Sequence, residues 1–193
     1  GSVVREITFP YEGEAIELVV RKGEMVLEGP FYQTVPVADG WELIQPSADT
    51  IYHFGQDGQL TPSIVRTPPV HSMEPVMLLA PTAETARYCF LRSMKRVADF
   101  KTFKGFPAEE FVYDKVDKSI CHYTLYNSDF TDQRTASLFA KPQSYPIVAC
   151  QPLQAPDLVE AYQAGKLQGR LKEIVAKLDE EDNAVIMLVK YKQ

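Results

Sequence analysis

The sequence predicts a mainly β protein of repeated antiparallel units, with two short helices before a final strand. The clearest unit is a hairpin, in which an alternating run over 50–54 meets the turn residues Asp57 and Gly58 and continues as a second strand to about Arg66. Alternation places successive side chains on opposite faces of a strand, and the Asp-Gly pair supplies the positive φ of a tight hairpin. A similar strand-turn-strand run recurs over 111–126. Repeats that lie tens of residues apart are typical of stacked or radially arranged β units.

Length and composition indicate one ordinary globular domain spanning 1–193. The chain is 45% hydrophobic and 24% charged, and 193 residues are enough for one sizeable core. Its net charge of -6, with the basic residues spread along the chain, argues against a nucleic-acid partner, because phosphate binding needs a concentrated basic surface.

The sequence offers no disulfide framework and no membrane span. The three cysteines, Cys89, Cys121 and Cys150, are far apart and each lies in or beside an apolar run, so we expect buried, inert thiols. No run reaches the ~20 apolar residues of a membrane span. Gly1 and Ser2 resemble a cloning remnant, and we expect that an export signal or lipid anchor was removed upstream.

Further strands are expected in the first half of the chain. A hairpin over 15–27 turns at Lys22 and Gly23, and the proline-rich stretch 67–75 is predicted to be a loop between β units. Phe100, Phe103 and Phe106 are expected in an aromatic-anchored loop. The remaining predicted strands lie at 3–9, 31–37, 41–45, 76–80 and 85–94.

The character of the chain changes after an irregular stretch, 127–141, and a strand at 145–151. An apolar stripe predicts a helix from Pro156 to Gly165, where glycine is a natural stop, and a second helix follows over 166–178. The final strand, 184–191, is apolar on both faces, so we expect it inside a sheet and not at its edge.

Two phrases of the sequence resemble a known family. The run 49–52 followed by 57–60, together with the ending 171–192, is similar to the C-terminal half of uncharacterised six-bladed β-propeller proteins of gut Bacteroidetes. The resemblance covers roughly Trp41 to the end and implies four-stranded blades, a periplasmic or cell-surface location, and binding in place of catalysis.

The length of the chain departs from that family. At ~40–50 residues per blade, 193 residues hold about three or four blades. The alternatives are a half propeller, a ring completed by a homodimer, or an open array of blades.

No catalytic or metal-binding motif is present, and no cofactor is predicted. The three histidines, His53, His71 and His122, form no HxH or HExxH spacing, and the adjacent Cys121 and His122 face opposite ways on a strand. We expect ordinary packed or surface histidines, with His71 the strongest binding candidate because loops carry binding sites. The acidic run 179–182 lacks the ligand order of a calcium loop and is expected to be a solvated turn.

Aromatic residues near predicted loops are the remaining binding candidates. Exposed rings of Tyr11, Phe31, Tyr32 and Trp41 could stack on sugars or contact a protein partner, and the competing interpretation is that they belong to the blade core. Together with His71, Tyr32 and Trp41 form the predicted binding set.

The preferred hypothesis is a non-enzymatic binding or interaction module of the cell envelope, with a glycan or a protein as ligand. A polysaccharide hydrolase or lyase that uses loop carboxylates is the first alternative. A purely structural assembly subunit is the second.

Overall fold

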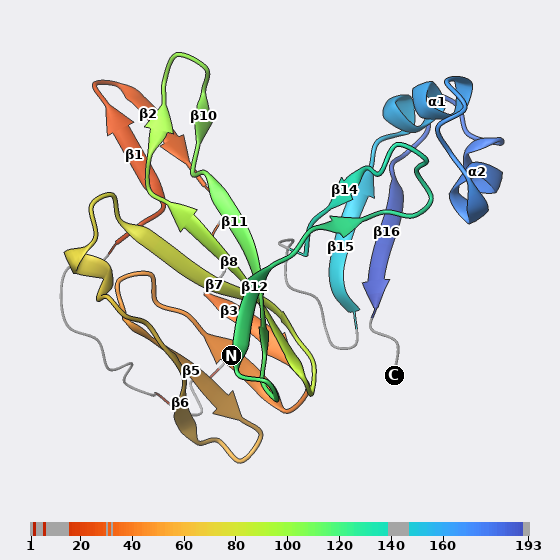
Figure 1. The fold of residues 1–193 in the computed structure, drawn as a ribbon. Coiled ribbons are helices and arrows are strands. Elements are labelled where there is room, and N and C mark those ends of the chain that lie inside the picture. The colour runs from red at the N-terminus through yellow and green to blue at the C-terminus, as the bar shows by residue number, and fades with distance from the viewer. Residues whose placement is uncertain are drawn as a thin grey trace. The chain divides into compact units, whose positions relative to one another are not determined.

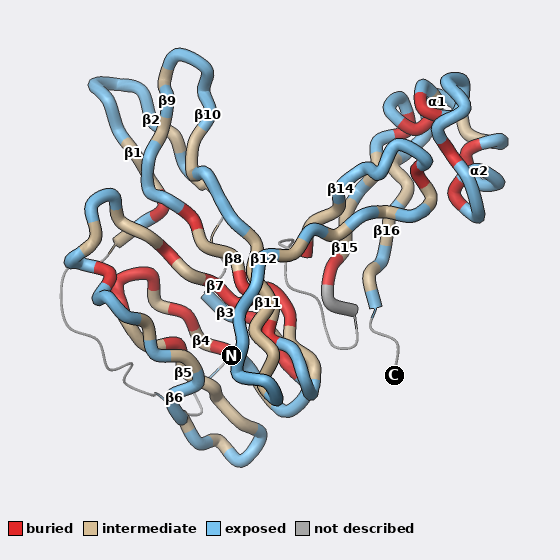
Figure 2. The backbone as a smooth tube through the Cα atoms, in the orientation of Figure 1, coloured by how far each residue is buried: buried red, intermediate tan, exposed pale blue. Residues whose placement is uncertain are grey.

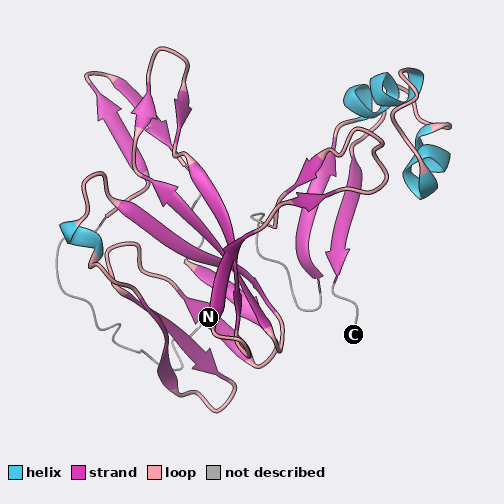
Figure 3. Ribbon diagram, viewed as in Figure 1, coloured by secondary structure: helices cyan, strands magenta, loops and turns pink. Residues whose placement is uncertain are grey.

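The computed structural model describes residues 2, 6, 16–29, 31, 33–138 and 147–190. These residues form a mainly β protein of antiparallel sheets with two α-helices late in the chain (Figure 3), as the sequence predicts. The strand predicted at 3–9, apart from Glu6, and the residues Tyr11 and Tyr32 lie outside the described residues.

The strands follow one another in the order shown in Figure 1. Those of the first half are β1 (Val19–Lys22), β2 (Met25–Glu28), β3 (Thr34–Val37), β4 (Gly40–Leu43), β5 (Thr50–Gly55), β6 (Leu60–Val65), β7 (Met77–Glu84) and β8 (Tyr88–Lys95). Those of the second half are β9 (Ala98–Asp99), β10 (Lys104–Gly105), β11 (Ala108–Asp114), β12 (Ser119–His122), β13 (Leu125–Tyr126), β14 (Thr135–Ala136), β15 (Ile147–Leu153) and β16 (Val185–Lys190). The helices are the 3-10 helix η1 (Val70–Ser72), α1 (Ala155–Gln163) and α2 (Gly169–Val175).

The chain divides into two compact units. Unit 1 holds residues 1–81 and 92–109, and unit 2 holds residues 82–91 and 110–193. The strands β7, β8 and β11 each continue from one unit into the other. The assignment of the chain to a single domain stays a prediction.

The predicted hairpin over 50–66 is confirmed as β5 and β6, the last two strands of a four-stranded sheet ordered β3-β4-β5-β6. Gly58 has φ +74°, as the turn requires, and the Asp57 carboxylate accepts a hydrogen bond from the Gln59 amide at 2.9 Å. Ile51 is 2% exposed and is the one buried residue of β5, whereas His53, predicted on the same face, is half-buried like Tyr52 and Phe54.

The proline-rich stretch 67–75 connects this sheet to a second four-stranded sheet, ordered β12-β11-β8-β7. It contains η1, whose Val70 is fully buried and donates its amide hydrogen to the Asp49 carboxylate at 2.6 Å.

Arg66, which directly precedes this stretch, makes two hydrogen bonds to the backbone. Its guanidinium donates to the Ala48 and Met77 carbonyls at 2.7 and 3.2 Å. Burial lowers the pKa of Arg66, and the charge of Asp49 opposes that shift.

Two shorter hairpins complete the described part of unit 1. The first is β1 and β2, which turn at Gly23 with φ +59° as predicted, and the second is β9 and β10. Between β9 and β10, Phe103 is 67% exposed with φ +52°, so this ring does not anchor the loop.

Helices α1 and α2 enclose a small core in unit 2. Leu158, Leu167, Leu171 and Val175 pack there with the buried ring of Phe130. The first helix ends before Gly165 as predicted, and this glycine has φ +69°.

The second helix is shorter than the predicted span 166–178. It begins only at Gly169, because Leu167 pairs with Phe130 as a β-bridge and holds the chain extended before the helix.

The prediction that the final strand lies inside a sheet is wrong for the described residues. Strand β16 pairs with β15 in a two-stranded sheet, and Ile186 and Leu188 are 53% and 49% exposed. Only the other face is covered, since Val185 packs against the helical core and Val189 packs near Ala149. Figure 2 shows the resulting alternation of half-buried and exposed residues along β16.

The expectation of three buried cysteines holds for Cys89 only. Cys121 is exposed and Cys150 is partly buried. Cys121 lies on β12, an end strand of its sheet whose four residues are all exposed.

Candidate functional site

A cavity of about 480 Å³ in unit 1 is the candidate binding site, and we call it the polar cavity. Four separate segments of the chain line it: the approach to β1, the end of β2, the connection from β2 to β3, and the residues after β4. The polar side chains on its wall are Glu17, Glu28, Gln33 and Gln45, and the apolar contributions come from Ile16, Leu18, Val19, Gly29, Phe31 and Pro46.

Backbone hydrogen bonds hold these segments together. The amide of Gly29 donates to the Leu18 carbonyl at 2.9 Å, and the amide of Ile44 donates to the Gln33 carbonyl at 2.8 Å. The Arg96 guanidinium donates to the Glu17 carbonyl at 2.9 Å. The approach to β1, the β2–β3 connection and the end of β4 are therefore fixed relative to their neighbours.

Gly29 allows the closest approach in the wall. A Cβ atom at this position would lie 2.6 Å from Leu18 Cδ2 and 2.8 Å from Phe106 Cδ2. These distances are well below ordinary carbon contacts of about 3.5–4.0 Å, so a side chain here would push the segment away.

Among the described residues, none of the four carboxylate and amide groups has an ion pair or a hydrogen bond from its side chain. Glu17, Glu28 and Gln33 are exposed, while Gln45 and the ring of Phe31 are half-buried. The site thus offers two anionic acceptors, two amides that both donate and accept, and one ring face.

Trp41 and His71 of the predicted binding set do not line this cavity. Trp41 is 47% exposed and lies on β4, on the face of the first sheet that also bears its cross-strand partner Phe54. His71 is exposed on η1. Tyr32 lies outside the described residues, although its neighbours Phe31 and Gln33 both line the cavity.

His53 makes acidic contacts that the sequence did not predict. Its Nδ1 lies 3.2 Å from Glu42 Oε1, and its Nε2 lies 3.7 Å from Asp39 Oδ1. Glu42 is only 3% exposed and lies directly across from His53 in the pairing of β4 with β5. The contact joins two neighbouring strands, and none of these residues lines the polar cavity.

No metal-binding cluster of three or more histidine, cysteine or acidic residues occurs in the part of the chain that the structure describes. Within the same residues, neither α-helix has the length and apolar character that crossing a bilayer requires.

The charged residues of the polar cavity escaped sequence analysis because they come from distant segments. Only Phe31 carried a signal, as an aromatic residue near a predicted loop. Glu17 and Glu28 flank the β1–β2 hairpin, so correct pairing of that hairpin would have brought them to one end of it.

Comparison with known proteins defines the fold only. No family model and no curated protein matches the sequence. The structure is similar to that of a Bacteroides fragilis protein described as exported, with a TM-score of 0.53 and 16% sequence identity. The match covers 83% of this chain and 49% of that one, so the chain spans about half the length of that protein. At this identity the likeness shows the antiparallel β architecture and nothing about activity.

Proposed function

We propose that this chain is a non-enzymatic binding module of the cell envelope that binds a neutral glycan in the polar cavity. The observation that supports this proposal is the composition of the wall, where two carboxylates, two amides and the ring of Phe31 line the same cavity. Sugars present hydroxyl groups that donate to carboxylates and exchange hydrogen bonds with amides, and their C–H faces pack on aromatic rings.

The size and charge of the cavity limit the kinds of ligand that it can bind. Its volume of about 480 Å³ falls within the ~300–1,000 Å³ of typical small-molecule sites. Glu17 and Glu28 would repel an anionic sugar, because like charges in one site are unfavourable. A neutral mono- or disaccharide unit is therefore the favoured ligand.

The architecture and location belong to the same proposal. In this proposal the two four-stranded antiparallel sheets are propeller-type blades. The description of the Bacteroides fragilis protein as exported supports a location in the cell envelope. The match spans about half of that protein, and a ring completed by a second copy of this chain is part of the proposal.

The test is binding of neutral oligosaccharides, measured by isothermal titration calorimetry on the wild type and on Phe31→Ala and Gln33→Ala variants. Each variant is expected to weaken binding by about tenfold, as loss of one good contact does. Phe103→Ala is the matched control, since Phe103 is a 67% exposed aromatic residue of the same unit that does not line the cavity. Absence of binding to every neutral glycan would refute the proposal.

Trp41 provides a second surface for the same test. If Trp41→Ala abolishes binding while Phe31→Ala leaves it intact, the glycan binds on the face of Trp41 and Phe54 and not in the cavity. His71→Ala and Tyr32→Ala complete the predicted set and show whether those side chains contribute.

Hydrolysis of a neutral polysaccharide is the second candidate, because two carboxylates, Glu17 and Glu28, line one cavity. Glycosidases place two carboxyl groups about 5–9 Å apart across the scissile bond. Release of reducing ends that disappears in Glu28→Gln, with glycan binding retained, would favour this activity over binding alone.

A further inference from the structure

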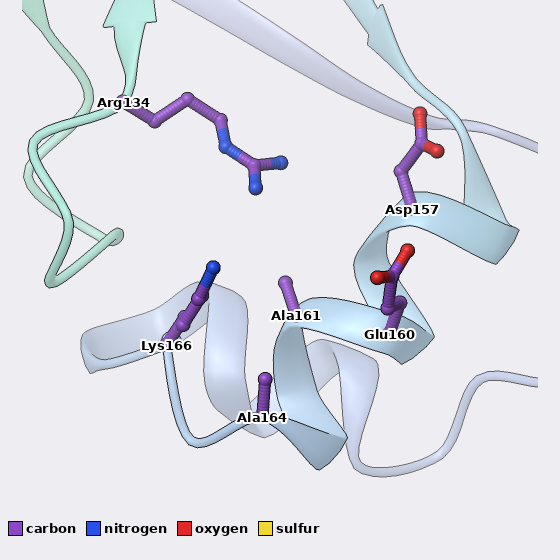
Figure 4. Close-up of a pocket in the computed structure, with 6 residues that line it drawn as sticks. All are labelled: Arg134, Asp157, Glu160, Ala161, Ala164 and Lys166. Atoms are coloured by element: carbon purple, nitrogen blue, oxygen red, sulfur yellow. The ribbon is translucent and has the colours of Figure 1, made fainter.

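A second cavity, of about 130 Å³, lies in unit 2 beside α1, and we call it the charged pocket. Its six lining residues are Arg134, Asp157, Glu160, Ala161, Ala164 and Lys166. Arg134 directly precedes β14, the acidic residues lie on α1, and Lys166 follows the turn after that helix. Figure 4 shows the Arg134 and Lys166 head groups pointing into the space, with the carboxylates of Asp157 and Glu160 on its other side.

The cationic wall is held by the helical core. The Arg134 guanidinium lies over the ring of Phe130, 4.2 Å from its centroid, and that ring is 3% exposed. A cation above an aromatic face is attracted by the ring electrons, so Arg134 has a defined position. The Lys166 backbone is fixed on both sides, since its amide donates to the Ala161 carbonyl and its carbonyl accepts from the Thr131 amide, both at 2.9 Å.

The two walls carry opposite charges that form no ion pair with each other. Within the described residues, Asp157 and Glu160 have no ion-pair partner, and Arg134 has none either. Lys166 approaches only Asp132, at 3.6 Å, in a pair whose side chains are 50% and 36% exposed. Such exposed pairs contribute little, so the Lys166 ammonium remains available to a ligand.

This arrangement selects a ligand with both charges. A simple anion would be attracted by Arg134 and Lys166 but repelled by the two carboxylates. A simple cation would be attracted by the carboxylates but repelled by Arg134 and Lys166. A zwitterion satisfies both walls at once through charge-assisted hydrogen bonds. The volume of the pocket is well below the ~300 Å³ of sites for larger ligands, so the ligand must be small. The small side chains of Ala161 and Ala164 line the space between the two walls.

We propose that the charged pocket binds a small free α-amino acid as its zwitterion. The carboxylate lies toward Arg134 and Lys166, and the ammonium lies toward Asp157 and Glu160. The alanine methyl groups contact the α-carbon and leave room for a side chain no larger than that of alanine. This site is independent of the glycan proposed for the polar cavity, because all of its lining residues belong to unit 2.

Calorimetric titration of the full chain with glycine and L-alanine tests the assignment, with acetate and methylamine as single-charge analogues. Glycine is expected to bind at least about tenfold more tightly than either analogue. Arg134→Gln and Glu160→Gln should each weaken glycine binding by about tenfold, the effect of losing one charge-assisted contact. Lys172→Gln and Glu173→Gln are the matched controls, since both residues are exposed on α2 and do not line the pocket.

A variant that keeps every charge separates binding from folding. Ala164→Leu should block glycine binding by filling the space, while the circular dichroism spectrum and the glycan affinity of the chain stay unchanged. Absence of saturable glycine binding, equal binding of acetate, or wild-type glycine affinity in both charge variants would each overturn the proposal. Loss of glycine binding in Phe31→Ala would contradict its independence from the polar cavity.

Discussion

Replacing Gly29 with alanine perturbs the closest packing in the wall of the polar cavity. The added methyl carbon would lie 2.6 Å from Leu18 Cδ2 and 2.8 Å from Phe106 Cδ2. Leu18 is 4% exposed and lines the polar cavity, so relief of the clash would shift either its side chain or the Gly29 segment within the cavity wall. Overpacking of this kind costs about 1–3 kcal/mol, and we expect the free energy of unfolding to fall by that amount.

Urea denaturation followed by circular dichroism measures this loss, and thermal unfolding provides a second readout. For a chain of this size the melting temperature should fall by about 2–4 °C per kcal/mol. The same variant should weaken glycan binding, because the segment that carries Glu28 and Phe31 is displaced.

A double-mutant cycle identifies the clash as the cause. Leu18→Ala removes the nearer of the two colliding side chains, so the cost of Gly29→Ala should shrink by at least about 0.5 kcal/mol in that background. A Gly29→Ala protein within about 0.5 kcal/mol of the wild type would refute the packing argument. So would an unchanged cost in the Leu18→Ala background.

Two further predictions concern unit 2. Leu158→Ala should lower the free energy of unfolding by about 2–5 kcal/mol, because Leu158 is 1% exposed in the helical core. The control Ile174→Ala, at a 39% exposed position, should lower it much less. Equal losses of the two variants in urea denaturation would contradict the assigned core. The Arg87 guanidinium donates to Asp114 at 2.8 Å and lowers the pKa of that carboxyl to about 2, so the pair stabilises the fold above the ordinary carboxyl pKa and loses this effect as the pH falls toward 2. In a ¹³C NMR titration Arg87→Gln should raise the pKa of Asp114, and an unchanged value would show that Arg87 is not the cause.

Local signals in the sequence predicted the hairpins and the first helix well. Gly23, Gly58 and Gly165 each have positive φ in the structure, and each marks a turn or helix end that the sequence assigns. These positions depend on backbone conformations that glycine adopts without strain, so a single residue is informative.

Signals that depend on the surroundings of a strand were less reliable. The apolar residues on both faces of β16 predicted an interior strand, but Ile186 and Leu188 are half exposed. An apolar side chain favours burial, but its identity does not show whether a neighbouring element covers it in the fold.

Most of the candidate site could not be assembled from the sequence. Glu17, Glu28, Gln33 and Gln45 belong to four segments that meet only through strand pairing and the close packing at Gly29. Each residue alone looks like an ordinary surface position, and only their convergence makes a cavity. The charged pocket was missed for the same reason, since Arg134 and Lys166 reach α1 from different segments.

Mapping a bound neutral oligosaccharide by ¹H–¹⁵N NMR is the most direct test of the proposed function. The account predicts saturable shifts of the backbone amides that line the polar cavity, at 16–19, Glu28, Gly29, Phe31, Gln33 and Gln45. Shifts confined to other parts of the chain, or no saturable shifts with any neutral glycan, would contradict it.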